Sequence, residues 1–273
     1  MTVEELIIYG KKYLHSTHVK MLLADLLNVN PLELLNYLDH EVSEDIINEF
    51  KKRIEVMQSD KPIQYVIGNV NFYGNKFQVN EKVLIPRFET EELVENTINY
   101  ISEIFPNTNL KVIDLGTGSG CIGITLKKKI PQLDVTLLDI SPEALQVAST
   151  NAKNLEVDVT LIQNDMLDNI EGTYDVIISN PPYIKTNEVI EDIVKNNEPH
   201  LALYAGIDGL DCYRKIIKEA KYHLNHPYLI AFEIGESQKE DIINLVKMSF
   251  PQATIISKKD MQDRDRMIFI YEK

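Results

Sequence analysis

The sequence contains little cysteine and no long apolar run. Only two cysteines occur among its 273 residues, Cys121 and Cys212, which excludes a disulfide framework and a cysteine-rich zinc site. No apolar stretch approaches the length of a membrane span, and the opening Met-Thr-Val-Glu-Glu is too acidic to begin a secretory signal. These absences predict a cytoplasmic protein without a membrane partner.

Tryptophan is absent, and positive charge is scarce. The chain has 28 Lys and Arg against 42 Asp and Glu, which gives a formal net charge of −14. Proteins that hold nucleic acid by its phosphates need positive charge, and those that stack on bases need aromatic platforms. The composition therefore argues against a direct nucleic-acid substrate. The net charge does not exclude a local basic patch.

The beginning of the chain has helical periodicity. Thr2 and Glu5 have the spacing of a capping box at a helix start. We expect a small helical domain over residues 1–61, whose role is either packing or the recognition of a partner. Apolar spacing predicts three further helices in it, one through Val19–Leu27, a short one over residues 32–38 and one beginning near Ser43.

The pattern changes from helical to alternating over residues 64–85. Val70 and Phe72 are followed by Phe77 and Val79, with a Tyr-Gly-Asn-Lys turn between them. Such alternation around a glycine turn predicts a β-hairpin. We expect it to link two domains over residues 62–86, and a helix to follow from Glu91 to about Phe105.

The second half of the chain alternates strands with helices. This order predicts an α/β fold, in which a mainly parallel, seven-stranded sheet is covered on both faces. We expect this catalytic domain over residues 87–273. The strands are predicted at 111–115, 135–139, 159–163, 174–179, 228–233, 254–257 and 267–271, and the main helices at 121–129, 142–154, 212–223 and 237–250.

A glycine-rich loop follows the first of these strands, with the sequence Gly116-Thr117-Gly118-Ser119-Gly120. Alternate glycines let the backbone turn tightly and approach a ligand without interference from a Cβ. Asp139, at the end of the next strand, could accept hydrogen bonds from both hydroxyls of a ribose. The pattern predicts a cofactor that contains a nucleoside.

Two cofactors are compatible with this loop. Gly118, Gly120 and Gly123 formally match the dinucleotide fingerprint, but Gly123 falls inside the predicted helix. Asp114 places a carboxylate before the loop, which suits a cationic ligand better than a pyrophosphate. S-adenosylmethionine carries an ammonium and a sulfonium and no phosphate, so we favour it over NAD.

The residues after the third strand are expected to meet the adenine ring. Asp165 would accept from the adenine amino group, and Met166 would pack on the ring. The chemistry indicated by these motifs needs no metal, and we expect none.

The motif Asn180-Pro181-Pro182-Tyr183 follows the buried strand 174–179. Two prolines cannot donate to a sheet, so the strand ends in a rigid turn whose polar groups are mainly acceptors. Ligands of open α/β sheets bind at the carboxyl ends of strands. Fixed acceptors beside the Tyr183 ring would suit a planar group with an NH2, such as an amide or a base, although the motif alone also fits an ordinary Asn-Pro turn.

Together these motifs resemble those of Rossmann-like methyltransferases that act on amino groups. Five further segments extend the resemblance over essentially the whole chain to the peptide chain release factor glutamine methyltransferases (PrmC/HemK family). These segments are residues 85–91, 198–203, 208–210, 233–235 and 263–266. Three residues depart from the family pattern and put local loop conformations in question: Phe88, Ala205 and Asp263.

The resemblance implies a function and a set of site residues. A member of this family would transfer a methyl group from S-adenosylmethionine to the side-chain amide of the glutamine in the Gly-Gly-Gln motif of release factors. Asn180–Tyr183 would bind that glutamine and act in catalysis, with Arg87 and Glu89 near the site. The cofactor would contact Gly116–Gly120, Asp139, Met166 and Asn180.

Two other functions are compatible with parts of the sequence. A nucleic-acid methyltransferase acting on DNA adenine or ribosomal RNA would also use an Asn-Pro-Pro-Tyr turn, but the charge, the absence of tryptophan and the lack of an inserted recognition domain count against it. A non-catalytic adaptor that keeps the fold would not need the intact turn. We expect a monomeric enzyme with release factors as partners.

Overall fold

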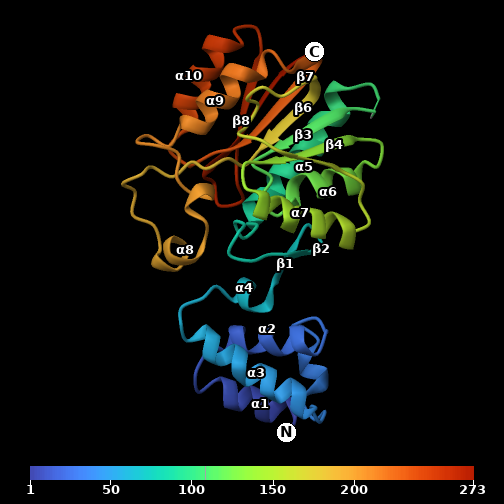
Figure 1. The fold of residues 1–273 in the computed structure, drawn as a ribbon, viewed down its shortest axis with the longest axis vertical. Coiled ribbons are helices and arrows are strands. Elements are labelled where there is room, and N and C mark those ends of the chain that lie inside the picture. Colours follow the sequence, from blue (N-terminus) through green and yellow to red (C-terminus); the bar gives the residue numbers. More distant parts are fainter. Residues whose placement is uncertain (108) are drawn as a thin grey trace. The chain divides into compact units, whose positions relative to one another are not determined.

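The computed structural model describes residues 1–107 and 109–273, which fold into two units (Figure 1). The first unit contains residues 1–69 together with 191–197, and the second contains residues 70–190 and 198–273. The short segment 191–197, from the second half of the chain, was not expected to belong to the first unit. Within the part of the chain described, no helix is long and apolar enough to cross a membrane.

The first unit is helical, as predicted. The Thr2 hydroxyl accepts from the Glu5 backbone N–H at 3.2 Å, and the Glu5 carboxylate accepts from the Thr2 N–H at 3.0 Å, which is the predicted capping box. Phe50 is fully buried among leucines and valines of the other helices. The elements of this unit are α1 (Val3–Gly10), α2 (Ser16–Leu26), η1 (Leu34–Tyr37), α3 (Glu44–Met57), α4 (Ile63–Ile67) and α8 (Asp192–Asn197).

The hairpin is shorter than the alternating stretch suggested. Ile63–Ile67 forms α4, and the two strands are β1 (Asn69–Phe72) and β2 (Asn75–Gln78). Phe72 and Phe77 pack edge to face and lie in the core of the second unit. The hairpin therefore contributes to the second unit through its own apolar side chains.

The second unit contains the predicted seven-stranded sheet, in the order β5-β4-β3-β6-β7-β9-β8. Only β9 runs antiparallel to its neighbours, β7 and β8. All seven predicted strands are present, and the largest shift of an end is at β7, which starts four residues early. The strands are β3 (Lys111–Leu115), β4 (Asp134–Asp139), β5 (Thr160–Gln163), β6 (Tyr174–Ser179), β7 (Leu224–Glu233), β8 (Thr254–Lys259) and β9 (Asp265–Glu272).

Helices cover both faces of this sheet (Figure 1). Because successive side chains of a strand point to opposite faces, Val112 packs in one core and Ile113 in the other. The first core lies under α5 (Phe88–Ile104), α6 (Cys121–Lys129) and α7 (Pro142–Asn154), and the second under α9 (Asp211–Ala220) and α10 (Lys239–Ser249). Helix α5 begins three residues before its predicted start.

The topology fixes where a ligand can bind. From β3 the chain proceeds outward through β4 and β5, and then crosses to β6 and β7 on the other side of β3. The strand order therefore reverses between β3 and β6, and open α/β sheets bind ligands at such a reversal, outside the carboxyl ends of the strands. The glycine-rich loop follows β3, and the Asn-Pro-Pro-Tyr turn follows β6. The two motifs lie at the same place in the sheet.

Candidate active site

A cavity of about 400 Å³ opens at this end of the second unit. Its size lies within the usual range for small-molecule sites. Loops after β3, β4, β5 and β6, the start of α5 and the segment around η2 (His200–Ala202) line it. The predicted site residues among its lining are Arg87, Gly116, Thr117, Gly118, Ser119, Asp139, Asp165, Met166, Asn180 and Pro182.

The glycine-rich loop has the conformation that its glycines allow. Gly116, Gly118 and Gly120 have φ angles of 67°, 55° and 81°, in the left-handed region. A Cβ built at Gly118 meets nothing within 4 Å, so this backbone borders open space. At Gly120 a Cβ would come within 2.7 Å of the Ile124 side chain, so this glycine serves the close packing of the loop.

Asp114 does not face the ligand, contrary to the reason we gave for preferring a cationic cofactor. It is fully buried, and its Oδ2 accepts from the Thr117 hydroxyl at 2.6 Å and from the Gly123 N–H at 3.0 Å. Burial raises the pKa of Asp114 to about 7, although these two hydrogen bonds lower it. Asp114 therefore connects the loop, through Thr117, to the first turn of α6, through Gly123.

Asp139 lies where a ribose-binding carboxylate is expected. Its Oδ2 accepts from the Gly118 N–H at 2.8 Å, and its Oδ1 accepts from the Ser141 N–H at 2.9 Å. Burial raises the pKa of Asp139, while these backbone hydrogen bonds lower it. Asp139 lines the cavity, and a carboxylate has about four acceptor sites, so it can accept further hydrogen bonds from a ligand.

Asp165 and Met166 also border the cavity. Asp165 forms an ion pair with Lys215 at 2.6 Å, a partner that the sequence did not suggest. Met166 has a φ of 51°, and its carbonyl accepts from the Asn164 side chain at 3.0 Å. This part of the cavity lining therefore contains an apolar side chain, Met166, next in sequence to a carboxylate, Asp165.

Residues of the turn after β6 line two different hollows. Asn180 and Pro182 line the main cavity, and Pro181 is buried. Tyr183 lines a second hollow, whose lining includes Arg266. Its carbonyl accepts from Gln238 Nε2 at 2.9 Å. Tyr183 therefore anchors the turn through its backbone, in addition to any contact made by its ring.

Gly209 should be essential for this anchor. Its φ is 75°, and a Cβ would lie 2.3 Å from the Tyr183 carbonyl oxygen. Gly209→Ala should lower the free energy of unfolding by about 3 kcal/mol, from left-handed strain and overpacking together. The control is Gly172→Ala, because Gly172 has a φ of 96° with nothing within 4 Å and should cost only the strain, about 1 kcal/mol. Urea unfolding measures both, and equal losses would contradict the packing argument.

Arg87 and Glu89 are both held by ion pairs at the start of α5. Arg87 lines the cavity and pairs with the buried Glu198, which also accepts from the Ile85 N–H at 3.1 Å. Glu89 pairs with Arg264 at 2.8 Å. Glu198 appears in the motifs behind the family resemblance, but the sequence did not assign it this role.

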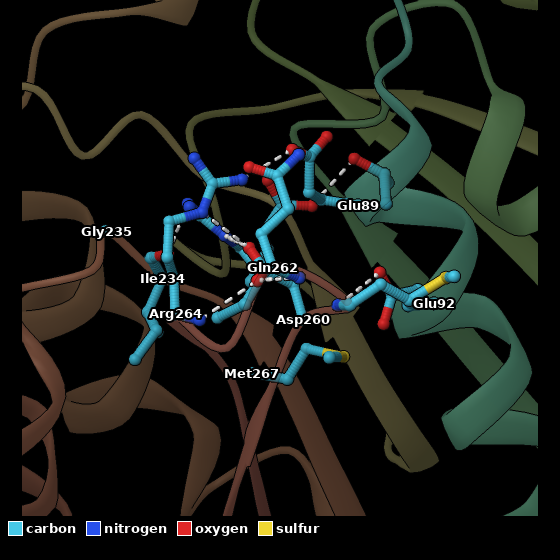
Figure 2. A network of polar contacts seen from close by, with 12 residues as sticks. Glu89, Glu92, Ile234, Gly235, Asp260, Gln262, Arg264 and Met267 are labelled. Atoms are coloured by element: carbon cyan, nitrogen blue, oxygen red, sulfur yellow. Dashed lines mark hydrogen bonds and ion pairs between the residues drawn. The ribbon is translucent and has the colours of Figure 1, made fainter.

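A network around Asp260 holds Arg264 and Arg266 (Figure 2). Asp260 Oδ2 accepts from Arg264 Nε at 3.0 Å and from Arg266 Nε at 3.2 Å. Arg266 also donates to the Ile234 carbonyl at 3.1 Å. The loop between β8 and β9 thus connects the start of α5 to the end of β7.

Comparisons with known proteins identify the family. The PrmC N-terminal domain model matches residues 13–68, and the methyltransferase small domain model matches residues 75–203. The chain is 40% identical over 255 residues to the release factor glutamine methyltransferase of Bacillus cereus, covering 92% of this chain and 90% of that protein. It is 38% identical over 270 residues to that of Streptococcus pneumoniae, covering 98% and 94%. The chain belongs to the release factor glutamine methyltransferase family.

Solved structures support the fold of this family member. A methyltransferase from Pyrococcus furiosus aligns with a TM-score of 0.52 at 16% identity, covering 84% of this chain and 98% of that one. The Thermus thermophilus 16S rRNA N2 G1207 methyltransferase, in complex with AdoMet and guanosine, aligns with a TM-score of 0.55 at 14% identity over 75% and 50% of the two chains. At such identities the likeness shows the fold alone.

Sequence reasoning missed the polar residues behind the Asn-Pro-Pro-Tyr turn in this family member. Thr90 and Glu233 are both buried, and Thr90 bonds to Asn180 and to Glu233. A buried threonine and glutamate near strand and helix ends could have been flagged as candidates, but not paired, because they are 143 residues apart. Among residues 1–107 and 109–273, no group of three or more His, Cys, Asp or Glu side chains could hold a metal ion.

Proposed function

We propose that this protein transfers a methyl group from S-adenosylmethionine to the side-chain amide nitrogen of the glutamine in the Gly-Gly-Gln motif of release factors. The observation that carries the proposal is the meeting of two motifs in one cavity. Asn180 and Pro182 border the same space as the glycine-rich loop and Asp139. A methyl donor held by the loop would therefore lie beside acceptors suited to an amide.

The residues around the loop fit S-adenosylmethionine. Asp139 has acceptor capacity for the ribose hydroxyls, Met166 offers an apolar surface for adenine, and Gly118 leaves open space for close approach. Asp165 would accept from the adenine amino group while paired with Lys215. When bound, S-adenosylmethionine supplies an electrophilic methyl group on its sulfonium sulfur.

The protein's main contribution is to orient the amide. An amide nitrogen is a poor nucleophile, because its lone pair is delocalised into the carbonyl. The Asn180 side-chain oxygen and the Pro181 carbonyl would accept its two N–H bonds, which fixes the nitrogen for attack on the methyl carbon and favours the positive charge that develops on it. S-adenosylmethionine would supply the methyl group and leave as S-adenosylhomocysteine, and the amide nitrogen would release one proton to water.

Cofactor binding should depend on Asp139. Hydrogen bonds to a charged group contribute about 1.5–3 kcal/mol each, so Asp139→Ala should weaken S-adenosylmethionine binding by about tenfold or more. Calorimetry on the purified variant measures the change. Asp134→Ala is a matched control, because it removes an exposed carboxylate at the other end of the same strand. Unchanged affinity in Asp139→Ala would remove this residue from the ribose site.

A transfer assay tests the proposed substrate. Methyl-labelled S-adenosylmethionine is incubated with the enzyme and, separately, with a purified release factor, ribosomal RNA and DNA. Label in the release factor, abolished when its Gly-Gly-Gln glutamine is changed to alanine, supports the proposal. Label in nucleic acid instead would favour an exocyclic-amine methyltransferase.

The first unit would recognise the release factor. Leu32 and Leu35 are 87% and 59% exposed there, and apolar surface that is exposed in a patch can mark a protein-interaction site. The double variant Leu32→Asp/Leu35→Asp should raise KM for an intact release factor about tenfold, and leave kcat nearly unchanged. Met248→Asp is the control, because Met248 is 83% exposed on α10 of the other unit. A KM equal to that of the control would contradict the recognition role.

A further inference from the structure

We infer that Thr90 and Glu233 are positioning residues that fix which end of the Asn180 side-chain amide faces the substrate. The inference rests on the proposed function and adds to it two residues that do not touch the reacting atoms. It starts from one chain of hydrogen bonds. Asn180 Nδ2 lies 3.2 Å from Thr90 Oγ1, and Thr90 Oγ1 lies 2.7 Å from Glu233 Oε2.

The sheet brings these three residues together. Strands β6 and β7 pair in parallel with Ser179 opposite Phe232. Asn180, the first residue after β6, and Glu233, the last residue of β7, each follow that pair. Thr90 comes from the first turn of α5 and lines the cavity with Asn180. Thr90 and Glu233 are each only 2% exposed, so water cannot readily replace either partner.

Counting protons fixes which group donates in each of these two hydrogen bonds. A hydroxyl has one proton, and an ionised carboxylate can only accept. If Glu233 is ionised, Thr90 must donate to it, and the Thr90 oxygen can then only accept from Asn180. The Asn180 NH2 must therefore face Thr90. The Asn180 oxygen is then free to accept from the substrate amide, together with the Pro181 carbonyl.

Protonation of Glu233 would allow donor and acceptor to exchange roles in both hydrogen bonds. A protonated Glu233 can donate to Thr90, whose own proton is then free to turn toward Asn180. The Asn180 oxygen would face Thr90, and its NH2 would face the substrate NH2, where two donors oppose each other. The ionised carboxylate thus selects the productive orientation.

The environment of Glu233 sets the pH at which this change would occur. Burial raises the pKa of Glu233 to about 7, and the charge of Glu89 adds to this, while the hydrogen bond from Thr90, the charge of Arg266 and a hydrogen bond from Asn180 lower it. The productive form is the ionised one, so methyl transfer should be lost as the pH falls through this value. The titratable or charged groups that act on Glu233 or contact its backbone are Glu89 on α5, Cys121 on α6, Tyr183 after β6, Tyr213 on α9 and Arg266 on β9.

The network around Asp260 (Figure 2) contacts the residues next to Thr90 and Glu233 in the sequence. Arg264 pairs with Glu89, which precedes Thr90, and Arg266 donates to the carbonyl of Ile234, which follows Glu233. Both arginines are held by Asp260. The backbones that carry Thr90 and Glu233 are therefore fixed relative to each other.

Kinetics on the full-length enzyme form the first test. Thr90→Val should lower the single-turnover rate by about 10- to 100-fold at saturating S-adenosylmethionine, with little change in KM for the release factor. Thr90→Ser keeps the hydroxyl and should restore most of the rate. The wild-type rate should rise with pH through about 7, and this rise should disappear in Glu233→Gln. A Thr90→Val rate within twofold of wild type, or a flat wild-type profile from pH 6 to 8, would overturn the inference.

A second measurement does not depend on the substrate. In protein labelled with ¹⁵N-asparagine, the side-chain signal of Asn180, identified by its loss in Asn180→Ala, should shift with an apparent pKa near 7 in the wild type. It should not shift in Glu233→Gln, which has no carboxylate to titrate behind Asn180. A signal that is independent of pH in the wild type would overturn the inference. A shifting signal in an enzyme that does not methylate release factors would support the positioning role and reject the proposed substrate.

Discussion

Asn180→Ala is expected to lower kcat for release-factor methylation by about 10²–10³, the usual scale for the loss of one preorganised polar contact. Asn180 lines the cavity and its Nδ2 lies 3.2 Å from Thr90 Oγ1, so we expect its oxygen to face the substrate before the substrate arrives. Alanine removes this acceptor and leaves the Pro181 carbonyl to hold the amide alone. KM for the release factor should change little, because affinity rests on a wider interface.

Single-turnover measurements at saturating S-adenosylmethionine decide this prediction. The matched control is Asn225→Ala, which removes an asparagine whose amide bonds to Asp175 at 2.8 Å, outside the cavity lining. It should leave the rate within a few-fold of wild type. If Asn180→Ala behaved like this control, orientation by Asn180 would not be the basis of catalysis.

The fold could be predicted from the sequence because its signals are local. Apolar runs, glycine turns and caps are each read within a few residues, and they gave every strand of the sheet. The errors also have local causes. Ile63–Ile67 is too short to establish helical periodicity, so α4 was included in the hairpin. The start of β7 was missed because Pro227 cannot donate to a sheet and argues against a strand, and the pairing of β6 with β7 does shift its register there.

The candidate site could be predicted only in part. The ends of neighbouring strands lie at one edge of the sheet, so the sequence could predict that Asp139 and Asn180 lie at one cavity, which they do; their roles there stay predictions. The direction of a buried side chain is set by partners far away in sequence, which local patterns do not encode. Asp114 was therefore placed near the ligand when it faces the loop interior, and the pair of Thr90 with Glu233 went unseen.

The three departures from the family pattern have different structural settings. Asp263 has a φ of 65°, the conformation that glycine adopts most readily and that aspartate tolerates better than most residues. Its N–H donates to the Asp260 carbonyl at 2.9 Å, so the loop forms with aspartate in place. Phe88 is exposed in the first turn of α5, and Ala205 is buried with its N–H bonded to the Ile184 carbonyl at 2.9 Å.

The enzyme is expected to discriminate strongly between glutamine and asparagine in the release factor. Changing the Gly-Gly-Gln glutamine to asparagine removes one methylene and withdraws the amide nitrogen from the acceptors at Asn180 and Pro181. A displacement of about 1 Å already costs on the order of 10²-fold in rate, so the single-turnover rate should fall by at least about 100-fold.

Because the acceptors are held by prolines and by the Thr90 contact, they cannot follow the shorter side chain. The loss should therefore appear in the rate and not in binding. The substituted release factor should still inhibit methylation of the unmodified one, with an inhibition constant close to the KM of the normal substrate. Methylation of the asparagine within tenfold of the glutamine rate would mean that the turn adapts to the substrate, and that rigid orientation is not what drives the reaction.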